Sequence, residues 1–171
     1  MKKLKKAWDI VSAVLVTGVV ILAVLLVGTR IMGLQVFNVI SGSMEPEYSV
    51  GDLLYVKTVD PDAVQVGDVI TFVLNKDLVV ATHRVVAIDT QNRQFTTQGD
   101  RNDTPDAAPV HFNNLIGSPV FSIPLLGYVS DYIQHPPGTY VAIGAIVILA
   151  TAVFLPDLLK KKEAKKEEET Q

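Results

Sequence analysis

Apolar residues are concentrated in two uninterrupted runs, one near each end of the chain. The first run, Ile10 to Val27, is 18 residues long and contains no charged side chain. A helix of about 20 apolar residues crosses a bilayer core of about 30 Å, so this run predicts a membrane-spanning helix over 10–30. The second run, Tyr140 to Leu155, has 16 residues and reaches a crossing length over 139–159 when its flanks are included.

Each run has an alternative interpretation. A cleavable signal sequence is the alternative for the first run. Its apolar region exceeds the usual length of about 7–15 residues, however, and its exit, Gly28-Thr29-Arg30-Ile31, lacks a small-residue cleavage site. We therefore expect the first run to be a retained anchor. A buried core helix is the alternative for the second run.

Lysines lie on the outer side of both runs. Residues 1–9 carry four lysines against Asp9, and residues 160–171 carry five lysines and four glutamates. Because cytoplasmic flanks of membrane helices are enriched in Lys and Arg, both termini are expected in the cytoplasm. The segment 31–138 then faces the extracytoplasmic side of a multi-pass protein. The membrane is the cell membrane or, in a eukaryotic host, that of the endoplasmic reticulum.

The segment between the two runs has the pattern of a β domain. Short β-branched stretches predict strands, and Gly-Asp or Asn-Lys-Asp turn signals, including Asn75-Lys76-Asp77, separate them. No stretch of this segment shows a helical period over three turns. The expected fold class is mainly β, a small irregular β-barrel-like domain flanked by two transmembrane helices. The expected strands are 52–57, 69–74 and 79–88, with weaker candidates at 95–97 and 119–123.

Composition excludes several classes of function. The 171 residues include no cysteine, which excludes disulfides, thiolate catalysis and cysteine-based metal sites. The region from Ile31 to Thr139 contains five Lys/Arg residues against twelve Asp/Glu residues. An acidic domain of this kind argues against nucleic-acid binding. Neither His111 nor His135 belongs to an H-E-x-x-H pattern, so no zinc site is expected.

Three polar clusters in the β domain carry candidate chemistry. They are Ser41-Gly42-Ser43, then Thr82-His83-Arg84 inside an apolar strand, and the acidic stretch Gly99–Asp106. Taken singly, they have ordinary explanations: a polar turn, a structural histidine and an acidic turn. Together they supply serine, histidine and aspartate. A neutral imidazole can take the proton of a serine hydroxyl, and a carboxylate can hold the imidazole in the required tautomer.

The order of these clusters resembles type I signal peptidases, specifically their endoplasmic-reticulum-type branch. In that branch a histidine replaces the lysine base of the bacterial branch. The resemblance covers about Val39 to Val129, and the flanking apolar runs fit the family's anchors. The matching segments are S-G-S-M-E-P at 41–46, G-D-L-L at 51–54, G-D-V-I-T-F at 67–72, T-H-R-V at 82–85, G-D-R-N-D-x-x-D at 99–106 and I-P-L-L-G-Y-V at 123–129.

The resemblance assigns a role to each polar residue. It implies that Ser43 is the nucleophile and His83 the general base. Asp106 matches the aspartate that completes the site, and Asp100 matches a second required acidic position. Ser41 would lie near the oxyanion hole together with the backbone N–H of Ser43.

The resemblance also implies an activity. The chain would be a membrane-anchored serine endopeptidase that removes signal peptides from translocated pre-proteins, after sites of the A-x-A kind. The precursor would lie extended against a strand edge. No cofactor and no metal are expected. Expected partners are secretory pre-proteins, the lipid bilayer and the translocation machinery, and not nucleic acid.

Two other classes of function remain open from the residues. One is a membrane-anchored β domain that binds or scaffolds without catalysis. The other is a protease with a Ser–Lys pair, for which Lys57 is the candidate because Lys76 lies in a turn signal. A lysine base needs a buried, desolvated site.

The charge pattern makes a testable prediction about topology. A protease added outside intact cells, or to the lumenal face of microsomes, should cleave within 31–138 and spare both lysine-rich ends. Epitope tags at the two termini report the protected fragments on a blot, and detergent-treated samples are the control. Cleavage of the C-terminal tag from the outside would contradict a second crossing.

Overall fold

The computed structural model describes residues 2–74 and 79–168. The chain forms two compact units, one of Val27–Asp131 and one that joins the chain up to Leu26 with the chain from Tyr132 onward. The first contains the β-sheet, and the second contains the two long helices. The turn expected at Asn75-Lys76-Asp77 lies outside the described residues.

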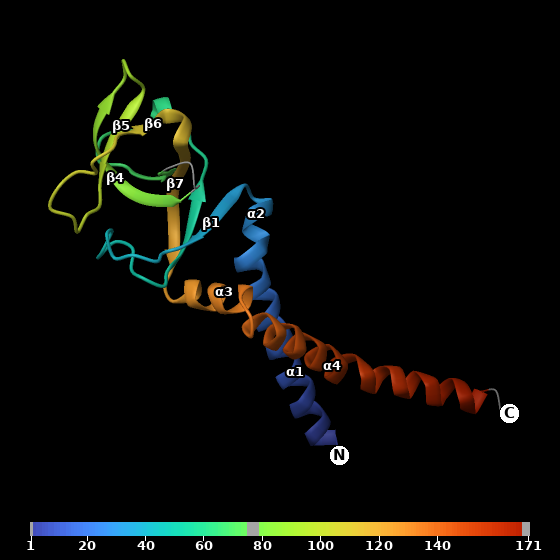
Figure 1. The fold of residues 1–171 in the computed structure, drawn as a ribbon. Helices are drawn as coiled ribbons and strands as arrows, with labels where there is room; N and C mark the ends of the chain where they lie inside the picture. Colours follow the sequence, from blue (N-terminus) through green and yellow to red (C-terminus); the bar gives the residue numbers. More distant parts are fainter. Residues whose placement is uncertain (1, 75–78, 169–171) are drawn as a thin grey trace. The chain divides into compact units, whose positions relative to one another are not determined.

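The β unit is a single antiparallel sheet of seven strands that curls on itself (Figure 1). The spatial order is β1-β2-β7-β3-β4-β5-β6, so the last long strand runs between the second and the third. This curl makes the fold a half-barrel. The strands are β1 Leu34–Asn38, β2 Leu53–Lys57, β3 Val69–Val73, β4 Val80–Asp89, β5 Gln94–Gln98, β6 Val110–His111 and β7 Leu115–Ile123.

The prediction of a mainly β domain is confirmed, and each expected strand is present. The three strong candidates became β2, β3 and β4, each within a residue or so of the expected bounds. The weaker ones lie inside β5 and β7. The sequence did not indicate β1, which follows the apolar run directly, or the two-residue β6.

Two stacked aromatic pairs contribute to the packing of the β unit. Phe95 and Phe112 stack with ring centroids 4.3 Å apart, and both pack in one cluster with the fully buried Phe72. Between the neighbouring strands β2 and β7, Tyr55 stacks on Phe121 with ring centroids 4.3 Å apart. Stacked pairs contribute about 0.5–1.5 kcal/mol beyond the area they bury. The two stacks therefore help to fix β2 on β7 and β5 on the turn that follows β6.

A short helix that begins in the β unit, α3 (Leu126–Gln134), was not expected from the sequence. Its nine residues are shorter than three turns, which explains the missing periodic signal. The helix begins against the chain before β2, where the Gly127 amide donates to the Gly51 carbonyl at 2.9 Å. A Cβ on Gly127 would lie 2.6 Å from that carbonyl oxygen, so this approach requires glycine.

The other unit contains α1 (Lys2–Ala23) and α4 (Gly138–Glu168), which contact each other. The chain continues from α1 through a π-helical turn, η1 (Val24–Gly28), into α2 (Thr29–Ile31). Within the described residues one segment, Ile10–Gly28, is a helix long and apolar enough to cross a membrane, with mean hydropathy 3.1 and none of it buried in the chain.

The second crossing, expected over 139–159, is less distinct. The described part of α4 passes the same test of length and hydropathy only together with α3, as a helix pair broken by a bend. The prediction of a β domain with an apolar N-terminal helix is thus confirmed, and the second transmembrane helix stays a prediction.

Candidate active site

Ser43 lies in the long connection between β1 and β2, which folds back on itself. Backbone hydrogen bonds close this connection at its base, from the Val39 amide to the Asp52 carbonyl and from Gly51 to the Val39 carbonyl, both at 2.9 Å. Met44, next to the serine, is 3% exposed and anchors the turn in the core. The sequence Ser-Gly-Ser-Met therefore presents a half-buried hydroxyl on a turn that an apolar side chain fixes in place.

His83 lies in β4 between Ser43 and Asp106, and it contacts both. Its Nε2 is 3.1 Å from Ser43 Oγ, and its Nδ1 is 2.6 Å from Asp106 Oδ2. With Asp106 ionised, Nδ1–H donates to the carboxylate, which leaves the Nε2 lone pair directed at the serine hydroxyl. The imidazole side chain is 14% exposed. The three residues are 40 and 23 positions apart in sequence, and the fold assembles them into one hydrogen-bonded chain.

The Asp106 carboxylate has a further donor, Thr97 in β5. Thr97 Oγ1 donates to Asp106 Oδ2 at 2.7 Å, and the Asp106 amide donates to the Thr97 carbonyl at 2.8 Å. Sequence reasoning did not single out Thr97. The available signal was weak, because one threonine in a strand of alternating side chains is ordinary.

Asp100 lies in the same loop but pairs with Arg84, the residue after His83. Both carboxylate oxygens accept from the guanidinium, at 2.8 Å from Nε and 2.6 Å from Nη2. Arg84 also donates to the Gly67 carbonyl at 2.8 Å and to Glu47, which follows Ser43 by four residues. The guanidinium holds the pKa of Asp100 below its ordinary value, and the Asp100 hydrogen bonds raise the pKa of Arg84.

The structure gives the two aspartates of this loop different partners. Asp106 is the one that hydrogen-bonds to His83, whereas Asp100 binds the neighbouring arginine. The Asp100 charge still acts on His83 through space, since the two interact electrostatically. The pairing with Arg84 ties the loop after β5 to β4 at the position next to the histidine.

Ser41 lies beside Ser43 on the exposed side of the turn, with 3.3 Å between the two hydroxyl oxygens. The Ser41 hydroxyl is therefore placed to donate to a group bound at Ser43.

Lys57, the candidate for a lysine base, is an exposed residue at the end of β2. Among the described residues that line the groove at Ser43 there is no lysine.

The loop after β5 approaches the serine turn closely at Gly99. The Arg101 amide donates to the Ser43 carbonyl at 2.9 Å, and the Arg101 guanidinium pairs with Glu45. A Cβ on Gly99 would lie 2.7 Å from the Ser43 carbonyl oxygen and 3.0 Å from Ser43 Cβ. Only glycine leaves room for this contact, so the G-D-R-N segment packs directly on the serine turn.

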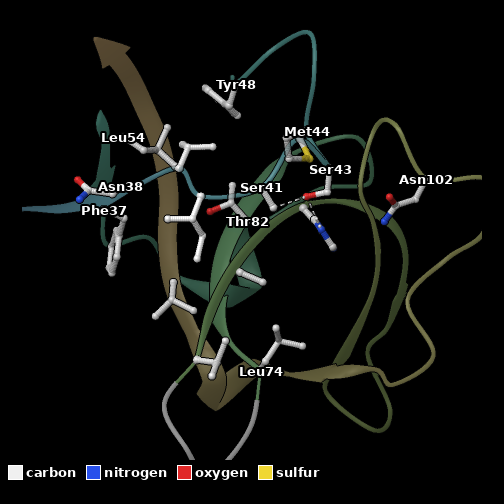
Figure 2. A pocket seen from close by; sticks show the side chains of 16 residues that line it. Phe37, Asn38, Ser41, Ser43, Met44, Tyr48, Leu54, Leu74, Thr82 and Asn102 are labelled. Atoms are coloured by element: carbon white, nitrogen blue, oxygen red, sulfur yellow. Dashed lines mark hydrogen bonds between the residues drawn. The ribbon is translucent and has the colours of Figure 1, made fainter. Parts of the chain in front are cut away.

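An open groove of about 650 Å³ leads up to the serine (Figure 2). One wall is the extended segment Val39–Ser41, and the other is the start of β4 at Val80–His83. Figure 2 shows Ser41, Ser43 and Asn102 gathered together, with Leu54 and Leu74 lining the apolar remainder. Burial raises the pKa of Tyr48 in this lining, and the adjacent Glu47 adds to the shift. The groove is apolar, with its hydroxyl and imidazole groups in one place.

The described residues include no group of three or more His, Asp or Glu side chains that could hold a metal ion. Outside the site, the His111 ring accepts a hydrogen bond from the Asn113 amide at 3.1 Å. The hydrogen-bonded chain of Ser43, His83 and Asp106 has the geometry of an activated hydroxyl, with a base aligned on the serine and a carboxylate behind the base.

Comparison with known proteins identifies relatives that match 63–65% of this chain. Signal peptidase I W of Bacillus subtilis (strain 168) is 37% identical over 117 residues, which are 63% of this chain and 61% of that protein. The signal peptidase complex catalytic subunit SEC11C of Homo sapiens is 27% identical over 125 residues, 65% of each chain. The catalytic subunit sec11 of Pyrenophora tritici-repentis is 36% identical over 124 residues, 65% of this chain and 70% of that one.

The chain spans about 61–65% of the length of the first two of these relatives. The family described as signal peptidase, peptidase S26, matches residues 10–101. This match covers more than half of the 171 residues and includes the apolar N-terminal helix, the Ser43 turn and His83. By this match, the chain belongs to the signal peptidase family S26.

Proposed function

We propose that this chain is a membrane-anchored serine endopeptidase that removes N-terminal signal peptides from translocated pre-proteins. The single observation that carries the proposal is the continuous hydrogen-bonded chain from Ser43 Oγ through His83 to Asp106, with distances of 3.1 and 2.6 Å. The names of the relatives, signal peptidase I and signal peptidase catalytic subunit, support the choice of substrate. The groove beside Ser43 supplies room for a peptide.

In the proposed mechanism, Ser43 Oγ attacks the carbonyl carbon of the scissile bond while His83 Nε2 takes the hydroxyl proton. Asp106 stabilises the imidazolium that forms. The imidazolium then returns the proton to the leaving amine, the C–N bond breaks, and an acyl-enzyme remains on Ser43. A water molecule, deprotonated by the same imidazole, attacks the ester and releases the signal peptide. No cofactor takes part in these steps.

The tetrahedral intermediate carries an oxyanion that needs hydrogen-bond donors. In our proposal the backbone N–H of Ser43 and the hydroxyl of Ser41 supply them. The 3.3 Å separation of the two hydroxyl oxygens supports this, since an oxygen of the reacting carbonyl would lie within reach of both residues. Asp100 acts at a distance in this scheme, because it holds Arg84 and so fixes β4 next to His83.

The substrate would bind extended in the groove, between Val39–Ser41 and the start of β4. Two facing backbone segments can pair with a peptide in the manner of an added strand, which fixes its direction and register. The apolar lining favours small, uncharged side chains before the cut, in agreement with sites of the A-x-A kind.

A pre-protein that is being translocated lies at the membrane, so the proposed enzyme is expected to be anchored there. The helix Ile10–Gly28 would cross the membrane, with the β unit on the extracytoplasmic side and both termini in the cytoplasm. A second crossing by the apolar part of α4 would make the protein multi-pass. The protein would reside in the cell membrane, or in the endoplasmic reticulum membrane of a eukaryotic host. Lipid and the translocation machinery would be its partners there.

Replacement of the nucleophile tests the proposed activity. Ser43→Ala should abolish cleavage of a pre-protein, with a loss on the order of 10⁶ as for a serine protease that loses its nucleophile. Ser41→Ala should lose about 10²–10³, as for one oxyanion donor. The assay is incubation of the full chain in detergent with a pre-protein, followed by N-terminal sequencing of the product. Unchanged cleavage by Ser43→Ala, or binding of the pre-protein without cleavage by the wild type, would contradict the proposal.

The pH dependence identifies the base. Histidine changes its charge between about pH 5 and 8, and a protonated imidazole cannot accept the Ser43 proton. We therefore expect kcat/KM to fall as the pH drops below neutral, and His83→Ala to be inactive from pH 6 to about 9. Lys57→Ala is the matched control and should keep its activity. Activity in His83→Ala that disappears on replacing Lys57 would instead assign a Ser–Lys pair.

The ion pair behind β4 gives a prediction about stability and pH. The folded pKa of Asp100 lies below the unfolded value, which for aspartate is about 3.9. The pair therefore stabilises the fold above that pH, and the contribution is lost as the pH falls through the lower folded pKa. Asp100→Asn should lower Tm at pH 7, and the difference from wild type should shrink towards pH 3. Asp103→Asn, an exposed neighbour, is the control, and a pH-independent difference in Tm would refute the assignment.

A further inference from the structure

Thr97 is a fully buried hydroxyl that directly contacts the site. Its side chain is 0% exposed, and its Oγ1 donates to Asp106 Oδ2 at 2.7 Å. That same oxygen accepts from His83 Nδ1 at 2.6 Å. One carboxylate oxygen therefore lies between two donors, the imidazole on one side and a hydroxyl in the strand on the other.

The strand holds Thr97 firmly. Thr97 lies opposite Val85 in the β4–β5 ladder, two residues beyond His83. The Thr97 carbonyl accepts a hydrogen bond from the Asp106 amide at 2.8 Å. This bond ties the far end of the loop 99–105 back to β5, the strand that precedes the loop. The backbone bond places Asp106 in the loop, while the hydroxyl contacts only its side chain. The two contacts can therefore be separated by substitution.

We propose that Thr97 is a positioning residue for the reaction, whose hydroxyl fixes the Asp106 carboxylate so that one oxygen faces His83 Nδ1. This inference rests on the proposed function. The Asp106 side chain is 19% exposed, and without the Thr97 donor its carboxylate can rock about the remaining hydrogen bond to His83 Nδ1. A carboxylate that rocks leaves the imidazole without a fixed direction towards Ser43.

The Thr97 hydroxyl also reduces the negative charge that the Asp106 carboxylate presents to His83. When the Asp106 oxygen that faces His83 no longer accepts the Thr97 hydrogen bond, it carries more negative charge. It then attracts the imidazolium more strongly, which favours the protonated histidine. The other charges near His83 are Asp100 from the loop after β5, Arg84 on β4 and Glu47 from the serine turn, joined in one ion-pair cluster. A substitution at Thr97 leaves this cluster in place.

The test compares Thr97→Val, which replaces the hydroxyl with a methyl group of similar size, with Thr97→Ser, which keeps the hydroxyl. The valine variant should lose roughly ten-fold in kcat, the equivalent of about 1.4 kcal/mol, with KM unchanged. The acidic limb of its kcat/KM profile should move to higher pH, and the serine variant should restore both. Thr96→Val is the matched control, because neighbouring strand residues face opposite sides of the sheet. Its activity and profile should stay those of the wild type.

A second measurement does not depend on activity. The full chain, labelled with ¹³C-histidine in detergent micelles, allows the His83 ring signals to be titrated by NMR and assigned through His83→Ala. In Thr97→Val the His83 midpoint should rise, while that of His111 stays constant and Thr97→Ser matches wild type. Should Thr97→Val fail to fold, Thr97→Ala removes the same hydroxyl without added bulk and replaces it in both measurements.

The outcomes are distinct. A His83 midpoint that is the same in wild type and in the hydroxyl-free variants would overturn the role of Thr97. An equal loss of activity in the serine and valine variants would overturn it as well, since that result indicates packing and not the hydrogen bond. A midpoint that rises as expected, in a wild-type chain that cleaves no pre-protein, would support Thr97 and overturn the proposed function alone.

Discussion

The Ser43–His83 hydrogen bond depends on the curl of the sheet. In the strand order, β2 and β4 are three steps apart, with β7 and β3 between them. Strands in a sheet are about 4.8 Å apart, so a flat sheet would separate β2 from β4 by roughly 14 Å. Curling brings the connection before β2 across the concave side to β4. A bulge between Tyr55 and Val56 and another between Val85 and Ala87 accompany this bending.

The loops that meet across the curled sheet are attached to each other as well as to the strands. The amide of Arg101 donates to Ser43, and Arg84 joins the serine turn, through Glu47, to the loop of Asp100. Individually, exposed ion pairs contribute little, but several that share one guanidinium restrain the loops together. The glycine at 99 allows the closest of these contacts, because any side chain there would meet the Ser43 backbone.

The aromatic core and the polar site have separate tasks in this fold. Stacked rings such as Phe95 on Phe112 fix the strands, and the polar side chains are carried at strand ends and in turns next to them. His83 and Thr97, by contrast, lie within β4 and β5, and the His83 ring approaches Phe72 edge-on at 6.3 Å between centroids. A base held in a strand has less freedom than one in a loop, which suits the proposed transfer of a proton over a short, constant distance.

The sequence by itself determined the apolar helix, the β character of the middle segment and the three residue types of the candidate site. These depend on local pattern: an uninterrupted apolar run, alternating β-branched residues, and polar clusters that interrupt them. Tertiary structure alone decided which carboxylate reaches the histidine. Asp100 and Asp106 lie in one acidic loop. Because the hydrogen bonds to Thr97 hold the end of that loop against β5, Asp106 contacts His83 and Asp100 contacts Arg84. Thr97 and α3 escaped prediction for the same reason, because their significance arises from contacts between segments distant in sequence.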